Sequence, residues 1–206
     1  EIGYITLLSN REPFQDPSLR RALAVSLNRS EISERVSYGL RSPLRALVPP
    51  SLAGGAMAPW PEHNPEQARE LLQAAGYCNG STLRFPLTFR SNVPADKLLA
   101  LTWQAQVQRD LSDCLVLDLD GVESTTIYRQ LGEGAFKAVM LDWRGSYPDP
   151  EAYLTPLLSC TSVEGNICME GEAVISGSFW SAPGLQTALL KSCLLYTSDA
   201  ADEQFG

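Results

Sequence analysis

The apolar residues of the first third of the chain recur at helical spacing, and capping residues mark where each predicted helix begins. One helix begins at Asp16, a cap that is followed by Pro17 in the first helical position. A short second helix is predicted after Ser30, and a third begins at Asn64 and ends at Gly76. The buried face of the first helix is predicted to contain Leu19, Ala22, Leu23 and Leu27. Residues 42–61 contain seven Pro or Gly residues and are predicted to be irregular.

After residue 82 the pattern alternates between strands and helices. Residues 83–89 alternate apolar with polar side chains, which predicts a strand. Short apolar runs at 115–119 and 138–141 predict two more strands, the last of them covered on both faces. Helices are predicted at 94–111 and 123–131. A β-α-β-α-β order indicates an α/β fold with a mainly parallel sheet and right-handed crossovers.

Two finer predictions follow from single residues in this region. Pro86 cannot donate a ladder hydrogen bond, so its strand is predicted to lie at an edge or to contain a bulge. In the helix at 94–111, the spacing of Leu98, Leu101 and Ala105 predicts that these three side chains face inward.

Candidate ligand-binding residues follow the predicted strands, because open parallel sheets bind ligands outside the carboxyl ends of their strands. Residues 142–150 are the most informative stretch, with two aromatic residues and two prolines after a buried strand. Trp and Tyr offer stacking faces with polar tips, and proline fixes the backbone that presents them. The candidates at these strand ends are Arg90, Asn92, Trp143, Arg144, Ser146, Tyr147 and Asp149. The same residue types are equally compatible with core packing and a simple turn.

The formal net charge of −8 argues against nucleic acid as a partner, because a phosphate-binding surface needs clustered Lys and Arg. His63 is the single histidine, and no nucleophile elbow, P-loop or dinucleotide fingerprint is present, so neither catalysis nor a cofactor is predicted. No apolar run approaches the roughly 20 residues that a membrane span requires. The chain opens without a signal-peptide pattern, which we interpret as the start of a fragment, the alternative being a mature protein that was trimmed.

Four cysteines precede the C-terminal segment: Cys78, Cys114, Cys160 and Cys168. None forms a C-x-x-C motif, so a zinc site is not predicted. Cys78 and Cys114 each precede a predicted strand, and adjacent parallel strands would bring them together. Cys160 and Cys168 lie close together in a polar segment that suits a loop staple. The four are therefore disulfide candidates, with free or buried thiols as the alternative.

The segment from Cys193 to Glu203 resembles a translated sequencing-library adapter. We therefore expect residues 193–206 to be a non-native tail, the alternative being a short amphipathic extension. Excluding Asp199, Asp202 and Glu203 changes the formal charge from −8 to −5.

Four ordered motifs resemble family 5 of the solute-binding proteins, the oligopeptide, dipeptide and nickel receptors of ABC importers. Tyr147-Pro148-Asp149-Pro150, with Trp143 before it, is similar to a signature of that family. Val48-Pro49-Pro50 resembles its proline loop. The helix from Asn64 through Ala75-Gly76-Tyr77 and the segment from Asn10 to Arg29 also match in order. The resemblance covers nearly everything before the adapter-like tail.

The resemblance implies a two-lobed receptor of the periplasmic-binding-protein class II type, with residues 1–192 forming an incomplete second lobe. Its implied partners are a peptide or other small solute and the subunits of an ABC permease. The implied location is periplasmic or otherwise extracytoplasmic, with the membrane approached only through the transporter or a lipid anchor outside this chain. The alternative function is a ligand-sensing or assembly domain that reuses the fold without transport.

Carrying the family's residues over one by one exposes one departure. Peptide receptors of the family hold the ammonium group of the peptide with an Asp just before the motif's Tyr, and that position here is the neutral Ser146. Asp142 or Asp149 could compensate for the missing charge. Residues 176–183 resemble a second ligand-side loop of the family, which makes Phe179 and Trp180 candidate ligand-binding residues. A hydrophobic plug beneath that loop is the alternative for this pair.

Overall fold

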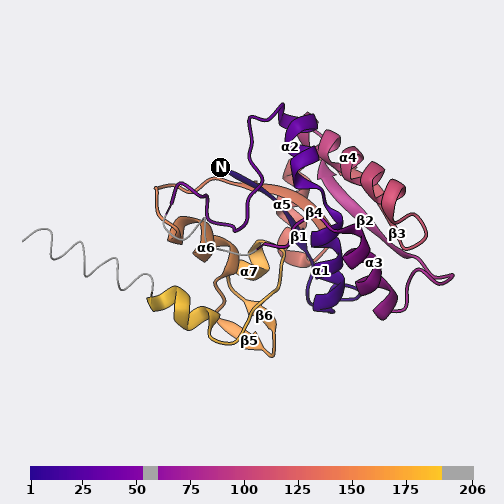
Figure 1. Cartoon of the computed structure of the whole chain (residues 1–206). Coiled ribbons are helices and arrows are strands. Elements are labelled where there is room, and N and C mark those ends of the chain that lie inside the picture. Colours follow the sequence, from indigo (N-terminus) through magenta and orange to yellow (C-terminus); the bar gives the residue numbers. More distant parts are fainter. Residues whose placement is uncertain (53–59, 192–206) are drawn as a thin grey trace, which may run out of the picture.

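The computed structural model describes residues 1–52 and 60–191 of the chain. Four strands form one mixed sheet in the order β1–β4–β2–β3 (Figure 1). The predicted strands are β2 (Leu83–Arg90), β3 (Leu115–Val122) and β4 (Ala138–Trp143), and β2 runs parallel to both β3 and β4. The predicted α/β lobe with a mainly parallel sheet is therefore confirmed. The expected tail at 193–206 and part of the irregular stretch lie outside the described residues.

The strand β1 (Ile2–Leu7), which runs antiparallel to β4, was not predicted. Its side chains serve two cores, because Ile2 packs on one side of the sheet and Ile5 and Leu7 on the other. A strand buried on both faces lacks the strict alternation of apolar and polar residues that makes a half-buried strand readable.

The prediction that Pro86 places its strand at an edge or in a bulge is wrong, because β2 lies between β3 and β4 and its register with β3 runs from Leu83 to Arg90 without a shift. The amide of Leu83 donates toward β3, to Cys114 O. Amides alternate sides along a strand, so Pro86, three positions on, directs its nitrogen away from β3. Pairing of β2 with β4 is confined to Leu87 and Thr88. The proline therefore sits just before that ladder begins, where no amide hydrogen is needed.

One face of the sheet is covered by α1 (Pro17–Ser26), α3 (Pro65–Ala74) and α4 (Pro94–Asp110), with α2 (Arg29–Ser37) packed against α4. The predicted caps of α1 and α3 are confirmed, since Asp16 accepts from Ser18 N and Asn64 from Gln67 N. The cap predicted for α2 is wrong. Asn28, two residues before Ser30, accepts from Glu31 N at 3.0 Å.

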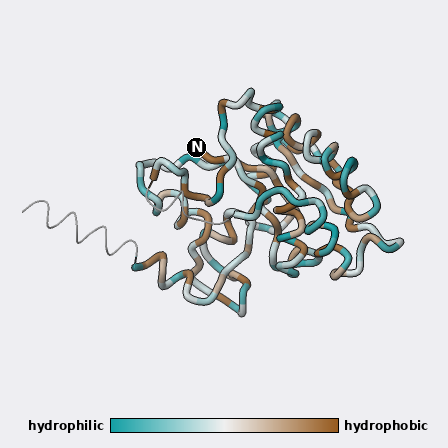
Figure 2. The backbone as a smooth tube through the Cα atoms, viewed as in Figure 1, coloured by the Kyte–Doolittle hydropathy of each residue, from teal (hydrophilic) through white to brown (hydrophobic). Residues whose placement is uncertain are grey.

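The inward face predicted for α4 is also wrong. Leu98 and Leu101 are 42% and 44% exposed, and Ala105 is exposed too. The buried side instead presents Trp103, whose indole N–H donates to Ser26 Oγ at 3.2 Å. Apolar and polar residues alternate along α4 (Figure 2), and apolar residues occur on its exposed side, as Leu98 and Leu101, and on its buried side, as Trp103. The largest side chain and its hydrogen bond decide which side is buried.

The other face of the sheet is covered by two groups of elements. α5 (Ser124–Gln130) and the 3-10 turn η1 (Leu131–Glu133) pack on Val139 and Leu141 of β4. α6 (Glu151–Leu158) packs on Ile2. Beyond α6 lie the hairpin β5 (Ser162–Glu164) and β6 (Ile167–Glu170) and the short helix α7 (Glu172–Ile175).

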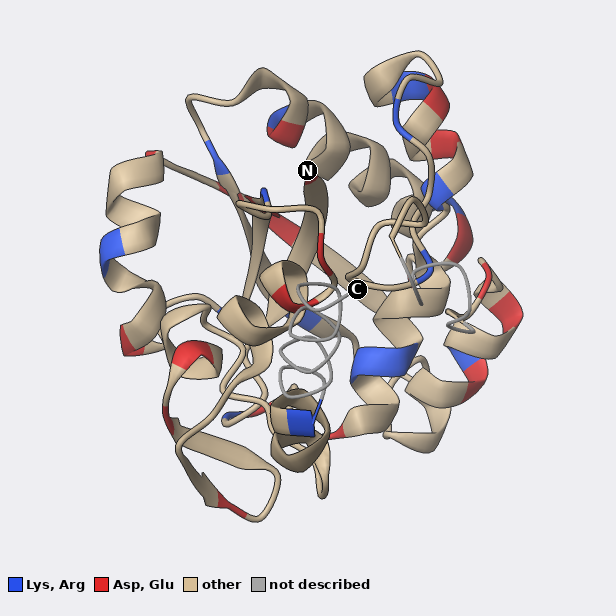
Figure 3. Cartoon of the chain, turned by 90° about the vertical axis from the view of Figure 1, so that its left-hand side faces the viewer, with Lys and Arg blue, Asp and Glu red and all other residues tan. Residues whose placement is uncertain are grey.

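Two disulfides fix the ends of this arrangement. Cys78 and Cys114 are bonded next to the starts of β2 and β3. Cys160 and Cys168 are bonded across the segment that joins α6 to the hairpin. Acidic and basic residues of the described chain are spread over several elements in Figure 3. Within the described ranges, the helices are too short or too polar to span a membrane.

Candidate functional site

The carboxyl ends of β2 and β4 meet around the buried guanidinium of Arg90. Its Nε and Nη2 donate to the two carboxylate oxygens of Asp96, in the first turn of α4, at 2.7 and 3.0 Å. Its Nη1 lies 2.8 Å from Asp142 Oδ1 and 3.4 Å from the Tyr128 hydroxyl. The side chains of Arg90, Asp96 and Asp142 are 7%, 12% and 36% exposed. One arginine thus ties two strand ends to α4 and α5.

The electrostatics of this cluster favour the charged guanidinium of Arg90. Hydrogen bonding to Asp96, which outweighs the opposing effect of burial, raises the pKa of Arg90 further above its ordinary value. Burial, aided by the nearby Tyr128 and Asp142, raises the pKa of Tyr4 and keeps that phenol neutral. Arg90 donates to two carboxylates, so the triad has one negative charge in excess, and Asp142 is the carboxylate that solvent reaches.

Tyr4 and Tyr128 are residues of this edge that sequence reasoning missed. Tyr4 belongs to the unpredicted strand β1, and Tyr128 lies on α5, away from the strand ends used to select candidates. Tyr128 is 51% exposed. The sequence places Tyr128 next to the apolar Ile127 in a predicted helix. That position says little about where the tyrosine ring points.

The aromatic loop after β4 is held by its first residue. The Trp143 indole N–H donates to Ala152 O at 2.7 Å, and its ring packs against the cluster around Ile2 and Tyr153. Gly145 is needed for the approach of α6, because a Cβ there would lie 2.6 Å from Tyr153 Cε2 and 3.2 Å from Ala152 Cβ. Trp143 therefore fixes the loop on α6, with its polar tip already hydrogen-bonded.

The middle of the loop faces solvent. Arg144, Ser146 and Tyr147 are exposed, Tyr147 by 50%. The Tyr147 hydroxyl donates to the Glu151 carboxylate, and the backbone carbonyl of Tyr147 accepts from Asp149 N at 2.9 Å. Asp149 Oδ1 accepts from Glu151 N at 2.7 Å and so orders the start of α6. The loop presents a restrained tyrosine ring, preceded along the chain by an exposed arginine and a small hydroxyl.

Asn92, the remaining candidate at this edge, has a structural contact. Its Oδ1 accepts from Ser124 Oγ at 2.6 Å and from Ser124 N at 3.2 Å, at the start of α5. The structure therefore brings the strand-end candidates to one edge. Arg90, Asn92 and Asp149 order it, while Arg144, Ser146 and Tyr147 are exposed on it. We call this surface the carboxyl edge.

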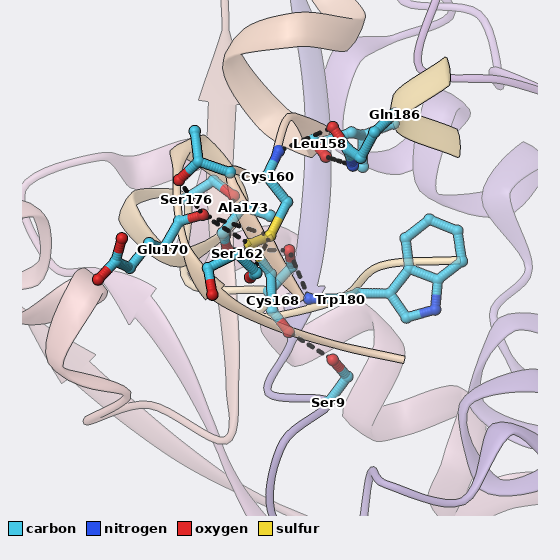
Figure 4. Close-up of a disulfide and its surroundings, with 12 residues drawn as sticks. Ser9, Leu158, Cys160, Ser162, Cys168, Glu170, Ala173, Ser176, Trp180 and Gln186 are labelled. Carbon is cyan, nitrogen blue, oxygen red and sulfur yellow. Dashed lines mark hydrogen bonds between the residues drawn. A yellow bond between two sulfur atoms is a disulfide. The ribbon is translucent and has the colours of Figure 1, made fainter. Parts of the chain in front are cut away.

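Phe179 and Trp180 lie elsewhere. The amide of Leu8 donates to Lys137 O just before β4, and Ser9 N donates to Ser178 O at 3.0 Å. The pair therefore lies beyond the amino end of β4, while Trp143 ends the strand. From its first residue to its last, β4 has six residues and rises about 3.3 Å per step, so its two ends lie roughly 17 Å apart. Figure 4 shows the Trp180 ring pointing away from the Cys160–Cys168 disulfide.

The chemistry available at the carboxyl edge is binding. Its open groups are a hydroxyl, a guanidinium, a partly exposed carboxylate and aromatic faces, which suit recognition of a small polar molecule. Among the described residues, no group of three or more His, Cys, Asp or Glu is placed to hold a metal ion. His63 lies near Asp110 and Arg109, away from this edge, and burial lowers its pKa.

Comparison with known proteins gives consistent findings. The family model of the bacterial extracellular solute-binding proteins, family 5 (middle region), matches residues 1–165. The glutathione-binding protein GsiB of Escherichia coli K12 is 29% identical over 159 residues, which are 76% of this chain and 30% of that protein.

Solved structures of the same kind share the fold. The oligopeptide-binding protein OppA of Haemophilus influenzae matches with a TM-score of 0.78 at 19% identity, over 92% of this chain and 36% of that one. A dipeptide-binding protein from Pseudoalteromonas sp. SM9913, in complex with Met-Leu, matches with a TM-score of 0.73 at 27% identity over the same shares. The chain thus spans about a third of the length of the relatives it matches.

Proposed function

The chain belongs to family 5 of the bacterial extracellular solute-binding proteins, and we propose that it is part of the substrate-binding component of an ABC importer. In this proposal residues 1–192 form most of the second of two lobes. The solute is captured when the lobes close on it and is then delivered to the permease. The family match over residues 1–165 is the observation that supports this function most strongly.

A peptide-like solute is the class that the relatives favour. The names of the matched proteins specify glutathione, the dipeptide Met-Leu, the peptide RPPGFSPFR and murein tripeptide. A nickel–histidine chelate also occurs among them. The common element is a small molecule with amino-acid character. We propose the same class for this chain, with binding and no chemical conversion, in a periplasmic or otherwise extracytoplasmic location.

The carboxyl edge is the proposed contact surface for the solute. Tyr147, Arg144 and Ser146 are exposed there on a loop that Trp143 fixes to α6. Arg90, Asn92 and Asp149 support the surface from behind through the contacts described above. Ser146 has no charge with which to hold an ammonium group, whereas Asp142, held by Arg90, retains a solvent-accessible carboxylate. We assign the attraction of a cationic group on the solute to Asp142.

Closure between lobes would work by differential affinity. A solute that touches both lobes stabilises only the closed state, so its binding free energy shifts the equilibrium toward closure. A rigid loop such as 143–150 loses little conformational entropy on binding, which favours affinity.

The test uses the complete protein that contains this chain. Titration calorimetry with glutathione and a set of dipeptides is expected to give saturable binding, with the peptide recovered unchanged by mass spectrometry. Tyr147→Ala is expected to weaken binding, while Trp180→Ala, at the opposite end of β4, serves as the matched aromatic control. Absence of binding by every peptide, or hydrolysis of a bound one, would count against the proposed function.

A further inference from the structure

A surface groove lies between the start of α1 and the tip of the β5–β6 hairpin, with Trp180 in its lining. Its volume is about 360 Å³, within the range of roughly 300–1,000 Å³ that is usual for small-molecule sites. One wall is formed by Gln15, Pro17 and Arg20, and the other by the hairpin turn around Asn166. The groove is distinct from the carboxyl edge, since the length of β4 separates the two.

The backbone is sharply bent at Phe179, the residue before Trp180. Phe179 has a φ of 53°, in the left-handed region that non-glycine residues rarely adopt. The bend sends the two neighbouring rings in different directions. Phe179 packs inward beside Gly134, where a Cβ would lie 3.5 Å from its ring. Trp180 turns to the groove. Such strained residues are concentrated at ligand-binding positions.

Hydrogen bonds hold Trp180 in place from both sides. Cys168 N donates to Phe179 O, and Ser181 N donates to Asn166 O, each at 2.9 Å. On the other side, Ser9 Oγ donates to Ser178 O at 2.7 Å (Figure 4). The Cys160–Cys168 disulfide closes the hairpin beneath. The indole is therefore presented by a preorganised frame, which reduces the entropy that a ligand must overcome.

The polar groups of the groove are complementary to hydroxyls. The indole N–H of Trp180 makes no hydrogen bond to any described residue, unlike those of Trp103 and Trp143. The amide of Asn166 and the carboxylate of Glu164 are exposed at the hairpin turn. Arg20 donates to the carbonyls of Phe14 and Gln15, and with Glu164 it leaves the lining neutral overall. Amides and a carboxylate beside an indole offer both donors and acceptors around one flat apolar face.

From this combination we infer that the Trp180 groove binds a neutral saccharide, one of whose rings stacks on the indole while its hydroxyls contact Asn166 and Glu164. A sugar ring has an apolar C–H face and a rim of groups that both donate and accept, which matches the groove. A charged ligand would be less favourable, because the lining has no net charge to neutralise it. This inference concerns a second site and does not depend on the proposed importer function.

The test is saturation-transfer NMR on the complete protein with three neutral probes: glucose, maltose and N,N′-diacetylchitobiose. At least one is expected to show transfer, strongest at the C–H protons of a single ring. Trp180→Ala is expected to weaken that binding about tenfold or more, the effect of losing one aromatic contact. Asn166→Ala, an exposed change on the hairpin turn, is expected to weaken it less while leaving the fold intact.

Tyr147→Ala is the matched control, since it removes an exposed aromatic ring from the other end of β4. It should leave saccharide binding unchanged and reduce peptide binding. Two results would overturn the inference: no transfer with any of the three sugars, or transfer that both Trp180→Ala and Asn166→Ala leave unaltered. Peptide binding that is unchanged in Trp180→Ala would show that the saccharide site and the peptide site are independent, so that the failure of one proposal leaves the other intact.

Discussion

The carboxyl edge and the Trp180 groove each present an aromatic side chain, yet they are built by opposite means. At the carboxyl edge a largely buried ion triad, with only Asp142 reached by solvent, and a hydrogen-bonded indole lie behind an exposed loop, so order comes from charge pairing. In the groove the half-buried indole of Trp180 makes no hydrogen bond to a described residue, and order comes from backbone hydrogen bonds and a disulfide. The difference teaches that the hydrogen bond of the indole N–H distinguishes a tryptophan that supports a site from one that could contact a ligand. The first surface should respond to loss of charge, the second to loss of covalent restraint.

The largest effect is expected from Arg90→Leu. It leaves the buried Asp96 without its bidentate partner, and such a loss typically costs about 3–5 kcal/mol in the free energy of unfolding. Arg84→Leu is the control, because the Arg84–Asp118 pair is 62% and 46% exposed and should contribute less than about 1 kcal/mol. Urea denaturation followed by circular dichroism measures both. Equal losses for the two variants would show that the triad does not order the carboxyl edge.

Removing the Cys160–Cys168 disulfide should affect the Trp180 groove and leave the carboxyl edge unchanged. For so short a loop, the double change Cys160→Ser and Cys168→Ser is expected to cost about 2.5 kcal/mol. Limited proteolysis should then cut within the β5–β6 hairpin before it cuts elsewhere. Any saccharide binding in the groove should weaken, whereas peptide affinity at the carboxyl edge, measured well below the melting temperature, should stay the same. Early cleavage at residues 143–150 would show that the disulfide also orders the carboxyl edge, which would contradict the proposed independence of the two surfaces.

Sequence reasoning found the helices with strong caps and the parallel strands, because those signals are local. Asp16 and Asn64 cap their helices through contacts two or three residues away. It failed for Leu98 and Leu101, since which side of α4 is buried depends on Trp103 reaching Ser26, 77 positions earlier in the chain. It also failed for Pro86, whose tolerance depends on how far β4 pairs with β2.

The candidate site shows the same division. The strand-end rule placed Arg90 and Trp143 at one edge, because the carboxyl ends of parallel strands meet in space. That rule could not show that the guanidinium of Arg90 pairs with Asp96 and Asp142, because this pairing joins residues of different elements. Nor could it show that Phe179 and Trp180 lie beyond the amino end of β4. Their position depends on the unpredicted strand β1, which leads the chain to Ser9 and its bond to Ser178.

Exchanging the two tryptophans for alanine compares the surfaces directly. Trp143→Ala removes a packed ring and its bond to Ala152, so we expect a loss of about 2 kcal/mol, below the value for a fully buried tryptophan. Trp180→Ala removes a ring that lines a groove, and the expected loss is under about 1 kcal/mol. Trp143→Phe should recover part of the packing without the hydrogen bond. A larger loss at Trp180 than at Trp143 would mean that Trp180 is a hydrophobic plug.

The smallest effect on stability is expected from Tyr147→Ala, and that is what makes it informative. Half of the tyrosine is exposed, and within the described part of the chain its hydroxyl bonds to Glu151 alone, so the free energy of unfolding should change by less than about 0.5 kcal/mol. If the ring contacts the solute, peptide affinity should still fall about tenfold, since an aromatic contact is worth roughly 1 kcal/mol or more. Tyr147→Phe should retain most of the affinity, because stacking needs the ring and not the hydroxyl. An unchanged dissociation constant in Tyr147→Ala would remove the exposed loop from the binding surface and leave Asp142 and Tyr128 as the groups that a solute could still reach there.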